Sequence, residues 1–251
     1  MNADHRHNRY YDRYATLMSA RHSQTRSQRQ SDKAIAWRMR HWLPTRKDAR
    51  ILDLGCGCGE MLEYFRRTGY EHIRGVDLSE EQVELAKQRH LTVIKKSAVD
   101  YLEEPSSRFD LIIALDVVEH LDKDTLDRFL AGCYQTLSDG GRLVIQTVNP
   151  ASPFFGACRY GDITHNLAIS PDMLRRLLEL HSFEQIEIRS LDPIPLGYSI
   201  MSSIRFVLWK AISAALQAMN VVETGAKSLC LTRNFILSAK RTFPTEPVAK
   251  S

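Results

Sequence analysis

The chain has 251 residues, of which 43% are hydrophobic and 25% charged, and these proportions exclude a collagen-like, low-complexity or wholly disordered protein. Its longest nearly apolar run, residues 206–222, contains Lys210 and is shorter than the roughly 20 apolar residues that span a bilayer. No secretory signal opens the sequence, because residues 1–14 are polar, charged and rich in His. We therefore expect a cytoplasmic protein.

Charge is distributed unevenly along the chain. Residues 1–50 carry 12 Lys and Arg against 4 Asp and Glu, residues 51–200 carry 15 against 24, and residues 201–251 carry 7 against 2. Solvated basic ends around an acidic domain would give this pattern, and composition favours that interpretation. Ends that face a phospholipid surface, a phosphorylated glycan or nucleic acid would give it too.

The five cysteines are an odd number, which argues against a disulfide framework. Cys56 and Cys58 are separated by one residue, whereas paired zinc ligands are usually separated by two or more. We therefore expect no metal site.

Strands and helices alternate from residue 50 onwards, after a basic N-terminal segment (1–49) with one predicted helix at 31–43. The pattern predicts strands at 51–54, 73–77, 91–95, 109–115 and 142–148, separated by helices at 60–67, 80–90 and 122–137. Beyond a long loop at 149–169, it predicts a helix at 170–181, strands at 183–190 and 234–240, and a helix at 199–219 between those strands. Such alternation is typical of an α/β fold with a doubly wound parallel sheet, which binds ligands at the carboxyl ends of its strands.

The helix at 199–219 repeats apolar residues at intervals of four: Ile200, Ile204, Leu208, Ile212 and Leu216. This face could pack on the sheet or on a second copy of the chain, as most amphipathic helices do. The alternative is an interfacial helix that brings the protein to the inner membrane as a peripheral protein.

A glycine-rich loop follows the first predicted strand, with the sequence Asp53-Leu-Gly55-Cys-Gly57-Cys-Gly59-Glu60. Dinucleotide-binding loops use G-x-G-x-x-G and place a pyrophosphate at the start of the next helix, where Glu60 would repel it. Asp53 fits a cationic ligand better. The second strand ends at Asp77, where a carboxylate can accept hydrogen bonds from ribose hydroxyls.

The segments ILDLGCGCGE, GVDLS, SAVDYL, FDLIIALDVVEHL and LSDGGRLVIQTVNP follow one another over residues 50–149. Together they resemble the class I S-adenosylmethionine-dependent methyltransferases. The resemblance implies a Rossmann-like, seven-stranded sheet with an antiparallel last strand. It also implies a methyltransferase domain at 50–240, with a helical insertion at about 191–231 and a C-terminal tail at 241–251.

The resemblance further implies S-adenosyl-L-methionine as cofactor. In the family, the acid and glycines of the first motif hold the methionine part, and the acid that ends the second strand holds the ribose. The matching residues are Asp53, Gly55, Cys56, Gly57, Gly59 and Asp77, with Leu78, Ser97, Ala98 and Leu115 around the adenine side. Ser97 stands where the family has an acid, so Asp100 is the alternative adenine contact, and it could instead cap a turn.

The segment Tyr160-Gly-Asp162-Ile-Thr164-His165, before the helix that starts at Pro171, resembles a subgroup encoded with bacterial surface-polysaccharide pathways. The resemblance implies a glycan or glycolipid acceptor, methylated on a sugar hydroxyl or a terminal phosphate. Arg159, Tyr160, Asp162 and Thr164 are then the expected acceptor-binding residues.

Histidine is the side chain best suited to take a proton from a hydroxyl near neutral pH. We predict His165 as the general base and His120 as the second candidate. His165 could instead only pin the loop, and a phosphate acceptor, being ionised already, would need no base.

Three other functions remain open at this point: a methyltransferase for a small quinone-type metabolite, a nicotinamide-dependent oxidoreductase, and a non-catalytic membrane-associated module. We expect no nucleic-acid partner, because the sequence shows no motif of a nucleic-acid methyltransferase and no RNA-binding module. A homo-oligomer is compatible with the sequence.

Overall fold

The computed structural model describes residues 28–104, 107–193, 199–225 and 230–242. The tyrosine-rich segment at 10–14 and almost all of the expected C-terminal tail lie outside these residues.

Seven strands form a single sheet in the order β3-β2-β1-β4-β5-β7-β6. Their bounds are β1 (Arg50–Leu54), β2 (His72–Asp77), β3 (Val93–Lys95), β4 (Phe109–Leu115), β5 (Leu137–Val148), β6 (Phe183–Ser190) and β7 (Asn234–Arg241). Strand β7 runs antiparallel to both of its neighbours, and the other pairs are parallel. The predicted fold is therefore confirmed, including the antiparallel last strand. Strand order reverses between β1 and β4, the point at which doubly wound sheets bind ligands.

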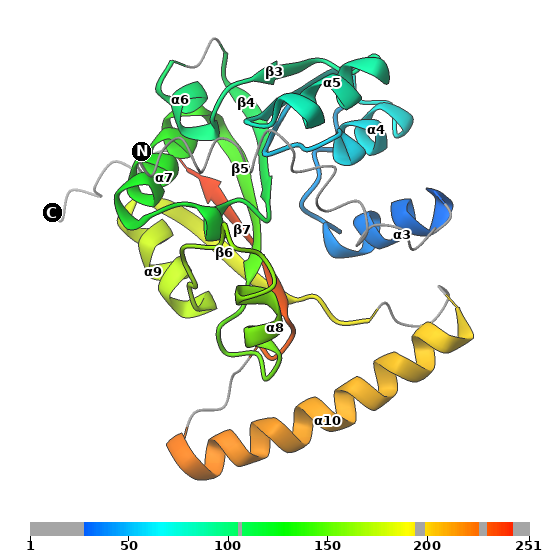
Figure 1. Cartoon of the computed structure of the whole chain (residues 1–251), viewed down its shortest axis with the longest axis vertical. Helices are drawn as coiled ribbons and strands as arrows, with labels where there is room; N and C mark the ends of the chain where they lie inside the picture. The colour runs from blue at the N-terminus through cyan, green and yellow to red at the C-terminus, as the bar shows by residue number, and fades with distance from the viewer. Residues whose placement is uncertain (1–27, 105–106, 194–198, 226–229, 243–251) are drawn as a thin grey trace, which may run out of the picture.

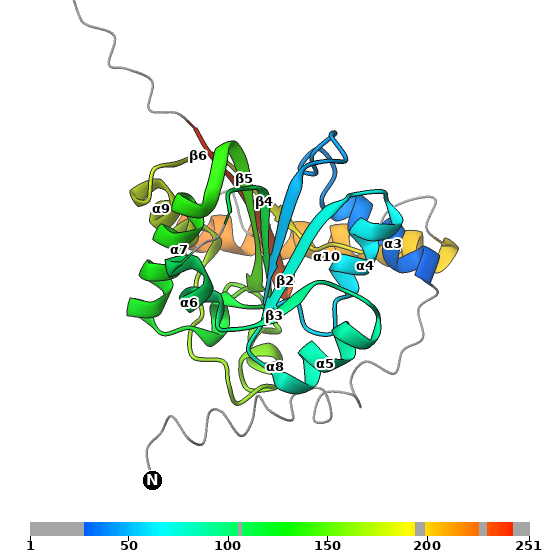
Figure 2. The ribbon, with the colours of Figure 1, turned by 90° about the horizontal axis from the view of Figure 1, so that it is seen from above.

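Helices cover both faces of the sheet (Figure 2). One face carries α3 (Gln28–Arg38), α4 (Glu60–Arg67) and α5 (Glu80–Gln88), and the other carries α6 (Ala98–Glu103), α7 (Lys123–Thr136) and α9 (Pro171–Leu180). Phe65 and Trp42 are buried on the first side, and Phe129, Phe183 and Phe235 on the second. The two apolar layers fix the sheet rigidly, and with it the strand ends that carry the polar residues.

The structure corrects several predicted boundaries. The helix expected at 122–137 ends at Thr136, and Gly140 and Gly141 lie inside β5 instead of ending the helix. Strand β5 accommodates them through a shift of register between Phe109 and Leu111 of its partner β4. Helix α3 begins three residues before the predicted cap, Ser31. The structure also has short helices that were not predicted: α6, η1 (Val118–His120) and α8 (Phe155–Arg159).

Helix α10 (Ile200–Thr224) lies apart from the body of the protein, along the edge where β7 begins (Figure 1). Among its residues only Ser213 is buried. Ile200, Ile204, Leu208 and Ile212 of the predicted apolar series are exposed, and the same arc of the helix adds Met201, Val207, Met219 and Val222. At 100° per residue these eight side chains occupy about 140° of the helix circumference. The predicted apolar face thus does not pack on the sheet.

The side of α10 that faces the body is held by a polar contact. The Trp209 indole donates to Asp192 Oδ1 at 3.0 Å, and Lys210 pairs with the same carboxylate. No helix within the described ranges is both long and apolar enough to cross a membrane.

Candidate active site

A cavity of about 850 Å³ opens at the carboxyl ends of β1, β2 and β4, where the strand order reverses. Nine of the ten predicted cofactor-binding residues line it: Asp53, Gly55, Cys56, Gly57, Asp77, Leu78, Ser97, Ala98 and Leu115. Gly59 is not among the lining residues. The motifs, which are dispersed over the sequence, thus meet around one cavity.

The glycine loop has a backbone that only glycine adopts easily. Gly55 has φ +70°, and a Cβ there would lie 2.5 Å from Val117 Cγ2. Gly59 has φ +87°, and a Cβ there would meet the buried Leu91 side chain at 2.3 Å. Gly55 therefore lets the loop approach Val117, between β4 and η1 (Val118–His120), whereas Gly59 serves the packing of α4.

A buried and a half-buried carboxylate, those of Asp53 and Asp77, lie together in the cavity. Asp53 is 2% exposed, and its burial, followed by repulsion from Asp77, raises its pKa to about 8. Burial also raises the pKa of Asp77, although backbone N–H groups of Ser79 and Gly57 donate to its two oxygens at 2.8 Å and partly offset the effect. Two neighbouring acids, one of them fully buried, are costly unless a cation joins them. The sulfonium and ammonium groups of S-adenosylmethionine meet that requirement.

The sequence left the roles of Ser97 and Asp100 open. Ser97 is the N-cap of α6, and its hydroxyl accepts from the Asp100 backbone N–H at 3.1 Å. Both residues line the cavity. Ser97 thus fixes the start of α6, and Asp100 sits in its first turn.

The rim of the cavity carries a polar chain that ends at His120. His120 lines the cavity, and its Nδ1 lies 2.8 Å from the hydroxyl of Thr164. That hydroxyl in turn lies 2.7 Å from Asp162 Oδ1. Asp162 and Thr164 are buried, so both act on His120 and on the loop backbone from below the surface.

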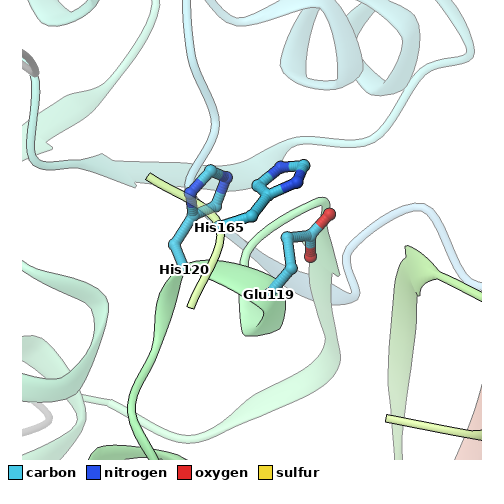
Figure 3. Close-up of side chains that lie close together, drawn as sticks. All are labelled: Glu119, His120 and His165. Carbon is cyan, nitrogen blue, oxygen red and sulfur yellow. The ribbon is translucent and has the colours of Figure 1, made fainter. Parts of the chain in front are cut away.

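His120 belongs to a group of three side chains, the Glu-His-His cluster, formed by Glu119, His120 and His165 (Figure 3). The two imidazole rings meet edge to face with centroids 4.8 Å apart. The loop that carries His165 is fixed to η1, because the backbone N–H groups of Asn166 and Leu167 donate to the Glu119 carbonyl at 2.7 and 2.9 Å. His120 and His165, 45 positions apart in the chain, are thereby held together.

Burial sets the charge state of the cluster. Glu119 is 1% exposed, and burial, with added repulsion from Asp116, raises its pKa to about 8. Burial lowers the pKa of His165, against an opposing effect of Asp162. His165 is therefore neutral at physiological pH.

The structure separates the predicted acceptor residues into two groups. Asp162 and Thr164 support His120, whereas Tyr160 is 83% exposed and does not line the cavity. The Arg159 guanidinium lies over the Tyr160 ring, with its Cζ 5.7 Å from the centroid, and Arg159 does not line the cavity either. Glu119 was not predicted. Its signal in the sequence is an acid beside His120 at the end of an otherwise apolar strand.

The family model described as a methyltransferase domain matches residues 25–190 of the chain. The chain belongs to this family. It is a class I S-adenosylmethionine-dependent methyltransferase, and S-adenosylmethionine is its cofactor. A solved structure of a SAM-dependent methyltransferase from Archaeoglobus fulgidus superposes with a TM-score of 0.61 at 26% identity, over 83% of this chain and 94% of that one.

Curated relatives include the ubiquinone biosynthesis O-methyltransferase of Bradyrhizobium sp. strain ORS 278, 35% identical over 40% of this chain. The mitochondrial ubiquinone biosynthesis O-methyltransferase of Mus musculus is 32% identical over 52% of this chain. The match spans 40% of the length of each relative. None of these comparisons points to the polysaccharide subgroup that the sequence resembles.

Proposed function

We propose that this methyltransferase methylates a hydroxyl oxygen of a small acceptor of the quinone-precursor type. The observation that carries the proposal is the Glu-His-His cluster at the rim of the cofactor cavity, where His120 lines the cavity itself. The curated relatives, which are named for ubiquinone biosynthesis, favour this acceptor over a glycan.

The cluster suits a hydroxyl because the hydroxyl has to lose its proton during the reaction. Bound S-adenosylmethionine supplies an electrophilic methyl group on a sulfonium. Asp53 and Asp77 are the groups that would hold its cationic and ribose parts, and the cavity wall would exclude water. The imidazoles of His120 and His165 can receive the acceptor proton or hold the group that does, and most of the rate enhancement comes from positioning.

Helix α10 favours a lipophilic acceptor. Eight of its exposed apolar side chains form one continuous face on a helix that lies along the edge where β7 begins, beside the carboxyl end of β5. Such a face, with few charges, can lie in the headgroup region of a bilayer. We therefore include in the proposal a peripheral contact with the membrane, from which a poorly soluble acceptor would reach the site.

An anionic acceptor, such as a terminal glycan phosphate, is the second candidate. Arg38, Arg205 and Arg233 line a second cavity, of about 620 Å³, between α10 and the ends of β5 and β7. Gln146 and Asn234 line it too, and both donate to the Asp116 carboxylate beside the first cavity, at 3.0 and 2.9 Å. Three arginines are a suitable environment for a phosphate.

Methyl transfer from radiolabelled S-adenosylmethionine to matched acceptors tests the proposal. We expect turnover with dihydroxylated aromatic acceptors that carry an apolar side chain, and little turnover with phosphorylated sugars. The reverse preference, lost on Arg233→Gln, would replace the proposal by the second candidate.

A further inference from the structure

The Glu-His-His cluster combines three potential metal ligands on two segments of the chain. A carboxylate oxygen of Glu119 and one ring nitrogen each of His120 and His165 all lie within 4.8 Å of one another. Figure 3 shows the three side chains next to one another, with the His165 ring between the His120 ring and the Glu119 carboxylate. Backbone hydrogen bonds between η1 and residues 166–167, together with Asn166 Nδ2 donating to the His120 carbonyl at 2.9 Å, hold both segments in place.

We infer that this cluster binds one divalent transition-metal cation, which holds the acceptor hydroxyl at the mouth of the cofactor cavity. Two imidazoles and one carboxylate are ligands of Zn²⁺, Fe²⁺, Co²⁺ and Mn²⁺ rather than of Ca²⁺, which prefers oxygen alone. Metal–ligand bonds of about 2.1 Å require donors about 3–3.4 Å apart, so binding would draw the three side chains inward. Three protein ligands leave coordination positions open for substrate oxygens.

The surroundings of His120 orient it as a ligand. The Thr164 hydroxyl lies 2.7 Å from Asp162 Oδ1 and donates to that carboxylate, so its contact with His120 has the imidazole Nδ1–H as donor. The unprotonated nitrogen of His120 is then Nε2. A ligating histidine whose other nitrogen donates to a polar chain of this kind is typical of metal sites.

His165 supplies an independent observation. Its Nδ1 is buried and has no hydrogen-bond partner. Buried polar atoms are nearly always paired, and an unpaired one calls for a partner that the protein alone does not provide. A cation coordinated by this nitrogen would be such a partner.

Glu119 supplies the charge. Its carboxylate is buried, accepts from the Thr147 hydroxyl at 2.9 Å, and lies near the like charges of Asp116 and Asp162. Within the described residues it takes part in no ion pair. A buried acid among other acids is stabilised by a cation that joins them.

The inference about the cation's role rests on the proposed function, whereas the site itself does not. An acceptor hydroxyl bound to the cation would have a lowered pKa and release its proton to water. Its oxygen then forms the new C–O bond, and the sulfur departs with the electron pair of the broken C–S bond. An acceptor with two adjacent oxygens could occupy two open positions at once, which makes vicinal diols and catechols the preferred class.

Titration of the full-length, untagged protein with Co²⁺ after removal of metals by a chelator tests the site. We expect one Co²⁺ per chain and a visible absorption spectrum of coordinated Co²⁺ in the wild type. Glu119→Gln and His165→Asn should each weaken Co²⁺ binding more than about tenfold, and Thr164→Val by about tenfold through its effect on His120. His72→Asn, which alters an exposed histidine outside the cluster, should bind as the wild type does.

Binding that is equal in the wild type and in the Glu119→Gln/His165→Asn double variant would overturn the inference. His5, His7 and His22 are present in all of these proteins, so any Co²⁺ that they bind is common to them. Unchanged affinity for S-adenosylhomocysteine shows that a variant is folded. If the variants do not fold, the wild type alone decides, because a specific cation must raise its midpoint of thermal unfolding. If the cation neither raises the midpoint of thermal unfolding nor binds stoichiometrically, the inference is wrong.

Activity separates this inference from the proposed function. Chelator should abolish hydroxyl methylation, and Zn²⁺, Mn²⁺ or Co²⁺ should restore it. A protein that binds Co²⁺ at the cluster but methylates only phosphorylated acceptors contradicts the proposed function and leaves the site intact. Full activity on a hydroxyl in chelator, without stoichiometric metal, contradicts the cation's role.

Discussion

The cofactor side and the acceptor side of the cavity are built in different ways. On the cofactor side, Asp53 and Asp77 lie at the ends of neighbouring parallel strands, and the Gly57 backbone N–H of the glycine loop donates to the Asp77 carboxylate. On the acceptor side, η1 meets a loop from 44 residues further along the chain, and α10 stands away from the body. The first side follows from short motifs, whereas the second depends on contacts distant in sequence, which is where acceptor specificity can vary without disturbing the cofactor.

Because the two sides are built differently, substitutions should impair cofactor binding and acceptor methylation separately. We expect the largest effect at His165. His165→Ala should lower kcat by roughly 10²–10⁴-fold, because the acceptor hydroxyl loses the group that activates it, whether by proton transfer or through a cation. Affinity for S-adenosylhomocysteine should not change, since the side chain does not line the cofactor cavity. Steady-state kinetics and calorimetry on the same preparation measure both.

His72→Ala is the matched control, because it removes an exposed histidine at the start of β2. A defect of His165→Ala confined to the acceptor KM would indicate that the side chain binds an anionic acceptor instead. Normal kcat and KM would make His165 a residue that only holds the loop.

The next largest effect concerns α10. The double change Ile204→Glu and Leu208→Glu should reduce binding to vesicles of anionic phospholipid more than about 100-fold, because two apolar anchors of about 1.5–3 kcal/mol each are lost. Sedimentation with vesicles measures the bound fraction. Leu180→Glu, at an even more exposed leucine on α9, is the control and should have no effect. If the wild type does not bind vesicles and forms a dimer that the double substitution dissociates, α10 is a subunit interface.

Helix α10 also illustrates what the sequence could and could not predict. Its helical period was evident, and so was the hairpin of β6 and β7, because alternation and apolar spacing are local signals. The direction in which the apolar face points depends on how α10 lies relative to the sheet, and no periodicity encodes that. Likewise His120 and His165 were each recognisable as candidates. The contact between the two rings, and the position of Glu119 beside them, depend on the backbone hydrogen bonds between η1 and residues 166–167.

A smaller effect is expected on the cofactor side. Asp77→Ala should weaken cofactor binding by about 1.5–3 kcal/mol, the range for hydrogen bonds to a charged group. Since Asp77 also accepts from the Gly57 backbone N–H, the variant should unfold at a lower temperature as well. Calorimetry and thermal denaturation check the two effects, with the exposed Asp124→Ala as control. Unchanged cofactor affinity would rule out Asp77 as the ribose ligand.

The smallest effect is a pH dependence that belongs to the cofactor side alone. The pKa of Asp53 is raised to about 8 in the folded protein, by burial and then by Asp77. From about pH 4 to 8 the folded protein therefore holds a proton that the unfolded chain has released, and its stability falls as pH rises through that window.

A cationic cofactor favours the ionised Asp53 carboxylate, so binding should expel this proton. The affinity for S-adenosylmethionine should then increase, by up to about tenfold per pH unit, as pH rises from 6 towards 8, and level off above. Calorimetry in two buffers with different ionisation enthalpies counts the protons released. In Asp53→Asn, which keeps the shape but cannot ionise, binding should be weaker and independent of pH over this range. A proton count of zero in the wild type would mean that cofactor binding does not change the ionisation of Asp53, and would contradict the proton release assigned to this carboxyl group.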